Sequence, residues 1–292
     1  MGKEYIGGVS FTDDTAQVAV LEVGGSEIKV RYLEDIKKGS SDDLWFLQGV
    51  FEMKEKRVRK VKKVKKVSVA VDNASLFLHS FPMDTSLTKA EQNEHVDWEL
   101  SNYLSEYNPK DYVNDVHILR TKAREHVCHV LTISVKKSLI YGIQNMLSEN
   151  KFELHIIDTN HFGAQYALIT NYPEVKTKVV ALVAVAHHRV DAGLLHSGRL
   201  IAYRYGLMTN RDDAVKLLQE VLKDTTISDL FIYGTAVSTE VVGAIENSLN
   251  IKVTKLNPFQ RLKIASSFRD FERFLGREHR FAASVGCALR KE

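Results

Sequence analysis

The chain has 292 residues, of which 44% are hydrophobic and 26% charged, and it carries a formal net charge of +3 at pH 7. This length and composition are typical of one large or two modest globular domains, and they argue against a long disordered chain. So small a net charge gives no general support for nucleic-acid binding, and the longest apolar run, residues 179–186, is too short to cross a bilayer.

The first residues show no signal-peptide pattern. The two cysteines, Cys128 and Cys287, stand far apart in apolar surroundings. This placement is typical of buried thiols in a reducing compartment and not of a disulfide framework. We therefore expect a soluble, cytoplasmic protein.

The N-terminal segment predicts three antiparallel strands. Apolar-rich stretches lie at residues 6–11, 17–23 and 27–33, and a polar turn at 12–15 separates the first two. Gly24 and Gly25 follow the second stretch, where glycine allows the positive φ of a hairpin turn. The pattern indicates a three-stranded meander.

The middle of the chain predicts both strands and helices. Residues 40–43 offer helix N-caps, and the helix that follows runs into a basic segment in which nine of the thirteen residues 54–66 are Lys or Arg. A later helix opens at Ser86 or Thr88, because Thr88 and Glu91 match a capping box. The other elements expected here are strands at 67–71, 76–81, 116–120 and 127–135 and a helix at 138–147.

The meander pattern returns about 170 residues later, which indicates internal duplication at the scale of a domain. Three strands are expected at 179–186, 190–195 and 199–205, with a polar turn after the first and Ser197-Gly198 after the second. The remaining expected elements are helices at 212–222 and 238–249 and strands at 230–233 and 251–256. Two lobes, each opening with a meander, are therefore predicted.

Several short segments carry a family resemblance that covers nearly the whole chain. The tail from Phe281 to Arg290 reads F-A-A-S-V-G-C-A-L-R. The other segments are Phe81-Pro82-Met83, Trp98-Glu99, Tyr107-Asn108-Pro109, Phe152-Glu153-Leu154, Ile157-Asp158-Thr159 and Asn257-Pro258-Phe259. In this order and spacing, they resemble the PilM family of type IV pilus assembly proteins, which belongs to the actin/Hsp70 superfamily and is related to FtsA.

The resemblance implies an α/β, actin-like fold of two lobes (Hsp70/actin/sugar-kinase superfamily) with a small inserted subdomain. We place the first lobe at residues 1–155, with the insertion at about 36–150 inside it. The second lobe follows at 156–270, with its upper subdomain reduced to a single helix between Met208 and Ser228. A C-terminal helix at 271–292 is expected to pack back on the first lobe.

The nucleotide loops of the superfamily are degenerate in this chain. Such loops need glycines, which let backbone N–H groups approach phosphate, and a carboxylate that organises Mg²⁺. By resemblance, Ser10 replaces that aspartate, Thr12 replaces a loop glycine, and Ala184-Val185-Ala186 replaces the second D-x-G. The degenerate nucleotide-binding positions are thus Ser10, Thr12, Asp13, Gly206 and Gly234. Asp13 and Asp14 fit a turn, with a displaced Mg²⁺ role as the alternative.

The resemblance therefore implies an adaptor and not an enzyme, with no cofactor expected and ATP with Mg²⁺ as the alternative. Its partner would be the cytoplasmic tail of a single-pass inner-membrane protein of a type IV pilus or type II secretion-like platform. That tail would bind in a groove between subdomains of the first lobe. The protein would be cytoplasmic and peripheral to the inner membrane through its partners, and an oligomer remains compatible with the sequence.

Two other functions stay open. One is an ATP-binding switch or weak ATPase of the same superfamily. The other is a lipid- or nucleic-acid-docking module centred on the basic segment, although no interleaved aromatics support sequence readout. Its electrostatic docking residues would be Lys54, Arg57, Arg59, Lys60, Lys62, Lys63, Lys65 and Lys66. His187-His188 lacks zinc-type ligand spacing, so exposure at a turn is the simpler interpretation.

Overall fold

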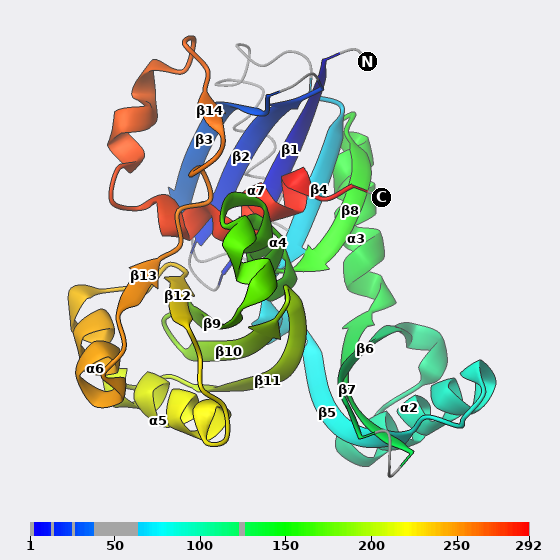
Figure 1. The fold of residues 1–292 in the computed structure, drawn as a ribbon. Helices are drawn as coiled ribbons and strands as arrows, with labels where there is room; N and C mark the ends of the chain where they lie inside the picture. The colour runs from blue at the N-terminus through cyan, green and yellow to red at the C-terminus, as the bar shows by residue number, and fades with distance from the viewer. Residues whose placement is uncertain (1–2, 13–14, 25–26, 38–63, 123–125, 292) are drawn as a thin grey trace.

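The computed structural model describes residues 3–12, 15–24, 27–37, 64–122 and 126–291, and these residues form two lobes and a small lateral sheet (Figure 1). Three sheets are present in this part of the chain. A six-stranded sheet has the order β14-β3-β2-β1-β4-β8, a five-stranded sheet the order β11-β10-β9-β12-β13, and a three-stranded sheet the order β5-β7-β6.

The first lobe is built on the six-stranded sheet. Its strands are β1 (Glu4–Phe11), β2 (Thr15–Val23), β3 (Lys29–Lys37), β4 (Lys66–Val71), β8 (Glu153–Thr159) and β14 (Lys263–Ile264). Strands β1, β2 and β3 form the predicted antiparallel meander, and β4 and β8 extend it in parallel. Helix α3 (Lys137–Glu149) packs its apolar side chains on one face, and the C-terminal helix α7 (Ala282–Leu289) packs on the other.

The second lobe repeats this plan. Its strands are β9 (Val179–Val185), β10 (Arg189–His196), β11 (Arg199–Leu207), β12 (Asp229–Tyr233) and β13 (Val253–Lys255). Strands β9 to β11 form a second antiparallel meander, and β12 and β13 continue in parallel. Helices α5 (Arg211–Leu222) and α6 (Thr239–Leu249) cover one face. Only α5 stands between β11 and β12 in the chain.

The small sheet lies between β4 and α3 in the sequence. It consists of β5 (Phe77–Asp84), β6 (Tyr112–Lys122) and β7 (Val127–Lys136), and helix α2 (Lys89–Tyr103) covers one face. The predicted capping box is present, since Thr88 and Glu91 exchange side-chain-to-backbone contacts at the start of α2. Both cysteines are buried and unpaired, as expected. In the described part of the chain, no helix is long and apolar enough to span a membrane.

The course of the chain between the lobes differs from the predicted boundaries. The boundary placed at residue 155 falls inside β8, which pairs with β4 of the first sheet. Strand β14 lies within the segment assigned to the second lobe, yet it pairs with β3. Both errors have the same cause, because a strand's partner is set by contacts that the local sequence does not encode.

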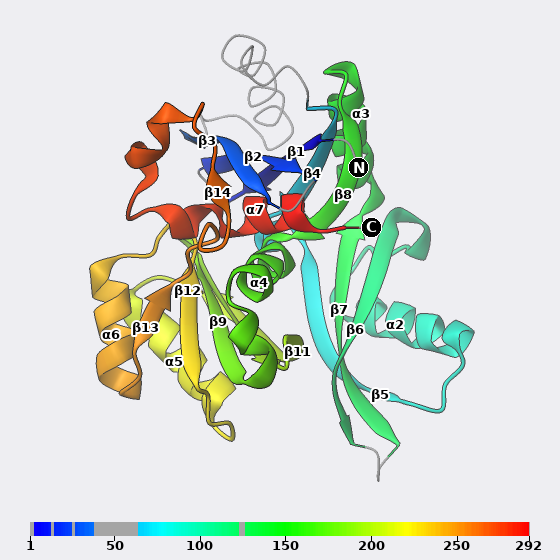
Figure 2. The same cartoon turned by 45° about the horizontal axis from the view of Figure 1, so that its top comes forward.

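Two helices cross at the junction of the lobes (Figure 2). Helix α4 (Asn160–Asn171) follows β8, and α7, whose residues are all buried, lies against it. A Cβ atom added to Gly286 would lie 1.7 Å from the carbonyl oxygen of Gly163, and one added to Gly8 would lie 1.9 Å from the carbonyl oxygen of Ser284. Glycine at these positions lets α4, α7 and β1 approach to backbone contact.

We therefore expect Gly286→Ala to destabilise the protein by about 3 kcal/mol or more, because the neighbour is rigid backbone and cannot move aside. Gly243→Ala on α6 is the matched control, since a Cβ there meets nothing within 4 Å. Removing glycine from a helix interior without a clash should stabilise by about 0.5–1 kcal/mol. Urea unfolding followed by circular dichroism measures both changes, and equal effects would contradict the proposed backbone contact.

Candidate functional site: the interlobe cluster and an adjoining groove

A buried ion pair forms the centre of the site between the lobes. Asp191 on β10 is only 4% exposed. Arg189, two residues earlier on the same strand face, donates from Nε at 3.0 and 3.1 Å and from Nη2 at 2.9 Å to its carboxylate. The Tyr203 hydroxyl, from β11, donates to the same carboxylate. Although burial lowers the pKa of Arg189, the Asp191 charge outweighs it and raises that pKa, so the guanidinium stays charged.

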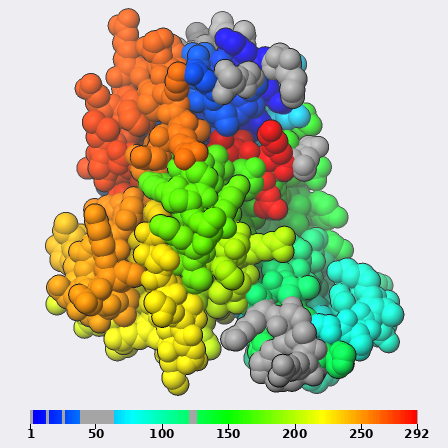
Figure 3. All heavy atoms as spheres, in the orientation of Figure 1, coloured from blue at the N-terminus to red at the C-terminus, as the bar shows by residue number. Residues whose placement is uncertain are grey.

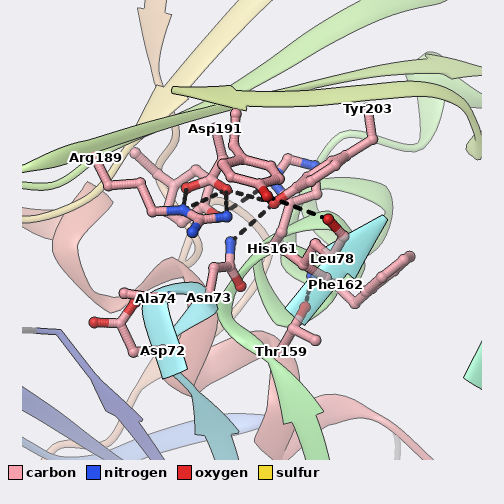
Figure 4. Close-up of polar contacts among 12 residues, drawn as sticks. Asp72, Asn73, Ala74, Leu78, Thr159, His161, Phe162, Arg189, Asp191 and Tyr203 are labelled. Carbon is pink, nitrogen blue, oxygen red and sulfur yellow. Dashed lines mark hydrogen bonds and ion pairs between the residues drawn. The ribbon is translucent and has the colours of Figure 1, made fainter. Parts of the chain in front are cut away.

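Residues of β11 connect this pair to the rest of the molecule (Figure 4). Asn73, which follows β4, is buried and donates from Nδ2 to the Tyr203 hydroxyl at 3.3 Å. Its position is set by a short 3₁₀ turn, in which Asp72 accepts a hydrogen bond from the Ala74 backbone N–H at 3.1 Å. Tyr205 donates to the Leu78 carbonyl oxygen of β5 at 3.3 Å.

His161, at the start of α4, completes the cluster. Its ring meets the Tyr203 ring edge-on, with centroids 5.0 Å apart and an interplanar angle of 76°. The Tyr233 hydroxyl lies 3.5 Å from Nδ1, and Gly193 leaves the room that the ring needs, since a Cβ there would lie 2.4 Å from Nε2. Burial lowers the pKa of His161 to about 4, so the imidazole is neutral near pH 7.

The side chains at the first nucleotide-loop positions form hydrogen bonds within the first lobe. Ser10 is buried in β1, and its hydroxyl donates to Gln17 Oε1 at 3.3 Å. Thr12 and Thr15 hold their hydroxyl oxygens 2.9 Å apart. Gln17 donates onward to Asp35 at 3.1 Å. Asp13 lies outside the described residues, as does Asp14.

The positions of the other three loops lie in strands or in close packing. Ala184 and Val185 are buried in β9. Gly234 has φ +117°, and a Cβ there would lie 2.3 Å from the Val185 carbonyl oxygen, so close packing accounts for this glycine. Gly206 lies within β11, paired with Val190, and not in a loop as predicted.

Mg²⁺ with ATP, which the fold family implies, does not fit the described residues. A metal needs a carboxylate that is free to hold it or its waters. Asp191 is engaged by Arg189, Asp158 forms an ion pair with Arg290, and Asp72 caps the 3₁₀ turn. No group of three or more His, Cys, Asp or Glu side chains in the described ranges is arranged to hold a metal ion, and His187 and His188 are exposed at a turn.

An open groove of about 410 Å³ lies beside the cluster. Three segments that are distant in sequence meet there: β6, α4, and the turn between β10 and β11, with the C-terminal segment at one end (Figure 3). Ile118 on β6 is 64% exposed, and the His117 and Phe162 rings stack with centroids 4.5 Å apart. The groove residues are His117, Ile118, Phe162, Gln165, Tyr166, Ile169, Gly198, Arg199, Leu200 and Arg290.

One polar atom in the groove lacks a hydrogen-bond partner. Gln165 donates from Nε2 to the Gly198 carbonyl oxygen at 3.1 Å, whereas its buried Oε1 atom has no partner in the described structure. Burying an acceptor without a donor costs about 1–3 kcal/mol. This oxygen is buried in the wall of the groove, so the contact area that the groove offers to a ligand comes mainly from side chains such as Ile118 and Phe162. No sequence motif marks the groove, because its walls come together only in the fold.

The basic segment is largely outside the described residues. Lys54, Arg57, Arg59, Lys60, Lys62 and Lys63 all fall there. Lys65 is exposed, while Lys66 begins β4 and forms an ion pair with Glu4 at 3.3 Å. The docking function assigned to this segment stays a prediction.

The duplicated meanders, the two crossing helices and the insertion define an actin-like protein of two lobes, which confirms the predicted fold class. No family model matches the sequence, and no curated protein matches it. Among solved structures, a chain of the PilM–PilN type IV pilus biogenesis complex matches 98% of this chain and 98% of its own length, with 15% identity and a TM-score of 0.74. The resemblance to the PilM family is thus confirmed at the level of the fold.

Two further structures share the fold. A protein with an actin-like ATPase fold and unknown function from Bacteroides thetaiotaomicron has 15% identity over 87% of this chain and 91% of that chain, with a TM-score of 0.57. The cytoplasmic domain of EpsL, an inner membrane component of the Vibrio cholerae type II secretion system, has 10% identity over 100% of this chain and 97% of that chain, with a TM-score of 0.51.

The neutral state of His161 predicts a pH dependence of stability. Its folded pKa is about 4, below the ordinary value of 6.5, so the unfolded chain binds the proton first as the pH falls. Above pH 6.5, this group does not change the free energy of unfolding. Between pH 6.5 and about pH 4, it lowers the free energy of unfolding by about 1.4 kcal/mol per pH unit. Urea unfolding should show a correspondingly shallower pH slope for His161→Gln than for the wild type. Identical slopes would mean that the folded protein protonates His161 normally.

Proposed function

We propose that this protein is a nucleotide-independent adaptor on the cytoplasmic face of an inner-membrane platform of the type IV pilus or type II secretion kind. It binds a cytoplasmic segment of a single-pass membrane partner and catalyses no reaction. The observation that carries the proposal is the match, over nearly the full length of both chains, to a chain from the PilM–PilN complex. The match to the EpsL cytoplasmic domain supports the same setting.

The interlobe cluster supports the absence of catalysis. An actin-like ATPase needs a carboxylate that positions Mg²⁺ and water beside the phosphates. Here the described interlobe carboxylates already have protein partners, and Ser10 offers a neutral hydroxyl engaged by Gln17. His161 is neutral and enclosed by Tyr203 and Gly193, so it is poorly placed to act as an acid or base.

The groove supports peptide binding. A short extended peptide gains affinity from main-chain hydrogen bonds and from pockets that hold a few of its side chains. Ile118 and Phe162 line the groove and offer apolar contact area for such side chains. The groove adjoins the insertion of the first lobe, but its other walls are α4 and the β10–β11 turn, whereas the predicted groove lay between subdomains of the first lobe.

Ile118→Asp tests this role of the groove. The side chain is exposed, so the substitution should leave folding intact while placing a charge against the apolar part of the ligand. We expect wild-type bait to retain a single-pass membrane protein from detergent-solubilised membranes of its source cells, and Ile118→Asp bait to lose it. A fluorescent peptide of that protein's cytoplasmic segment should then bind Ile118→Asp at least about tenfold more weakly.

Tyr141→Asp is the matched control, because Tyr141 on α3 is similarly exposed, at 57%, and is not a groove residue. This variant should bind the peptide as the wild type does. Equal peptide affinity for Ile118→Asp and the wild type would reject the groove as the binding site. If the wild type retained no single-pass membrane protein, the adaptor function itself would fail.

A further inference from the structure

Two tyrosines of β11 reach out of the second lobe on the same strand face. Tyr203 accepts a hydrogen bond from Asn73, which follows β4 of the first lobe, and Tyr205 donates one to Leu78 on β5 of the small sheet. Asn73 and Leu78 are separated by a short segment of chain, so both bonds attach β11 to the same connection. We call Asn73, Leu78, Arg189, Asp191, Tyr203 and Tyr205 the β11 latch.

The ion pair within the second lobe holds both tyrosines in place. Tyr203 is buried, and its hydroxyl donates to Asp191, which orients the oxygen to accept from Asn73. The Arg189 guanidinium lies 4.0 Å from the centre of the Tyr205 ring, in cation–π contact. Burial and the Asp191 charge raise the pKa of Tyr203 well above its ordinary value, so the hydroxyl keeps its proton. One charged pair therefore fixes both hydroxyl groups.

The latch provides a polar attachment of the second lobe, apart from the crossing of α4 and α7 and in addition to the apolar packing of the small sheet against that lobe. A single crossing of helices can act as a hinge, and lobes joined by a hinge can rotate about it. A second attachment at a separate place prevents that rotation. In the superfamily that the fold resembles, a nucleotide bound between the loops bridges the two lobes. In this chain those loops are degenerate, and in the described structure protein side chains form the bridge.

We infer that the β11 latch replaces the nucleotide as the bridge between the lobes and holds them in one fixed orientation. The latch also positions the groove, because β11 supplies Arg199 and Leu200 to one wall while the small sheet supplies Ile118 to the other. This second consequence rests on the proposed adaptor function. The fixed orientation does not, and it can be measured without any partner.

The test is a distance measurement by electron spin resonance between labels on two exposed positions, Glu106→Cys beside α2 and Ser248→Cys on α6. Both native cysteines are buried, which keeps them from labelling. We expect a single narrow distance distribution for the otherwise wild-type protein. The double variant Tyr203→Phe with Tyr205→Phe keeps both rings and loses both hydroxyls, so its distribution should broaden or shift.

Tyr103→Phe is the control, because Tyr103 is exposed on α2 and takes no part in the latch. Its distribution should match the wild type. Tyr205→Phe alone removes only the hydrogen bond to the Leu78 carbonyl oxygen. Because Tyr205 is partly exposed, this single variant should fold, and it keeps the test valid if the double variant misfolds. In it, amide hydrogen exchange near Leu78 should speed up by about fivefold to tenfold, corresponding to the loss of one hydrogen bond.

An unchanged distance distribution in the folded double variant, or unchanged exchange near Leu78 in Tyr205→Phe, would overturn the latch. If the variants loosen the lobes but bind the partner peptide normally, the latch stands and its effect on the groove is rejected. Loss of peptide binding in Ile118→Asp with normal lobe spacing would support the groove alone. The two proposals can therefore fail separately.

Discussion

The backbone contact between α4 and α7 is the constraint on which the rest of the structure depends. Helices normally keep their backbones apart by the width of their side chains. Here Gly163 and Gly286 remove that spacing, and Gly8 lets α7 lie directly on β1. The crossing joins the first lobe to the second through buried residues, and it fixes where the start of α4, with Asn160 and His161, enters the space between them.

That space determines what the protein can do. In an actin-like ATPase, it needs a carboxylate that is free to hold Mg²⁺ or its waters beside the nucleotide. In this chain, the carboxylates that the structure describes there are paired with Arg189, Arg290 or backbone, and the tyrosines of β11 make contacts across the gap. Breaking a buried pair of this kind is costly, because the remaining charge would stay unpaired. The arrangement thus favours one lobe orientation over a switch between two.

Much of the fold could be predicted from local sequence. The two meanders were visible because turn residues and apolar runs repeat in the same order, and the start of α2 was visible because Thr88 and Glu91 form a local capping box. Helix α4 was not predicted, because residues such as Gly163, Ala164 and Ala167 are buried against another helix and leave no amphipathic stripe. Strand β8 was not predicted either, since most of its residues are only partly buried.

The candidate site was less accessible to prediction. The degenerate loops could be recognised residue by residue. In the structure, the Ser10 hydroxyl donates a hydrogen bond to Gln17 within the same lobe. Nothing in the sequence, however, indicated which contacts between the lobes take the place of nucleotide binding. Asn73 and Tyr203 are 130 residues apart, and a contact of that range follows only from the packing of the lobes. The groove has the same origin, because β6, α4 and the β10–β11 turn become neighbours only after folding.

The most direct test of the central claim is isothermal titration of the purified protein with ATP and Mg²⁺ up to millimolar ligand, paired with thermal unfolding in the same solutions. A nucleotide-independent adaptor should show no saturable heat and no rise in the melting temperature. A ligand that bound the folded state would instead stabilise it, by about 2.7 kcal/mol at about one hundred times its dissociation constant. Saturable binding with that stabilisation would contradict a nucleotide-independent adaptor and make the protein an ATP-dependent switch.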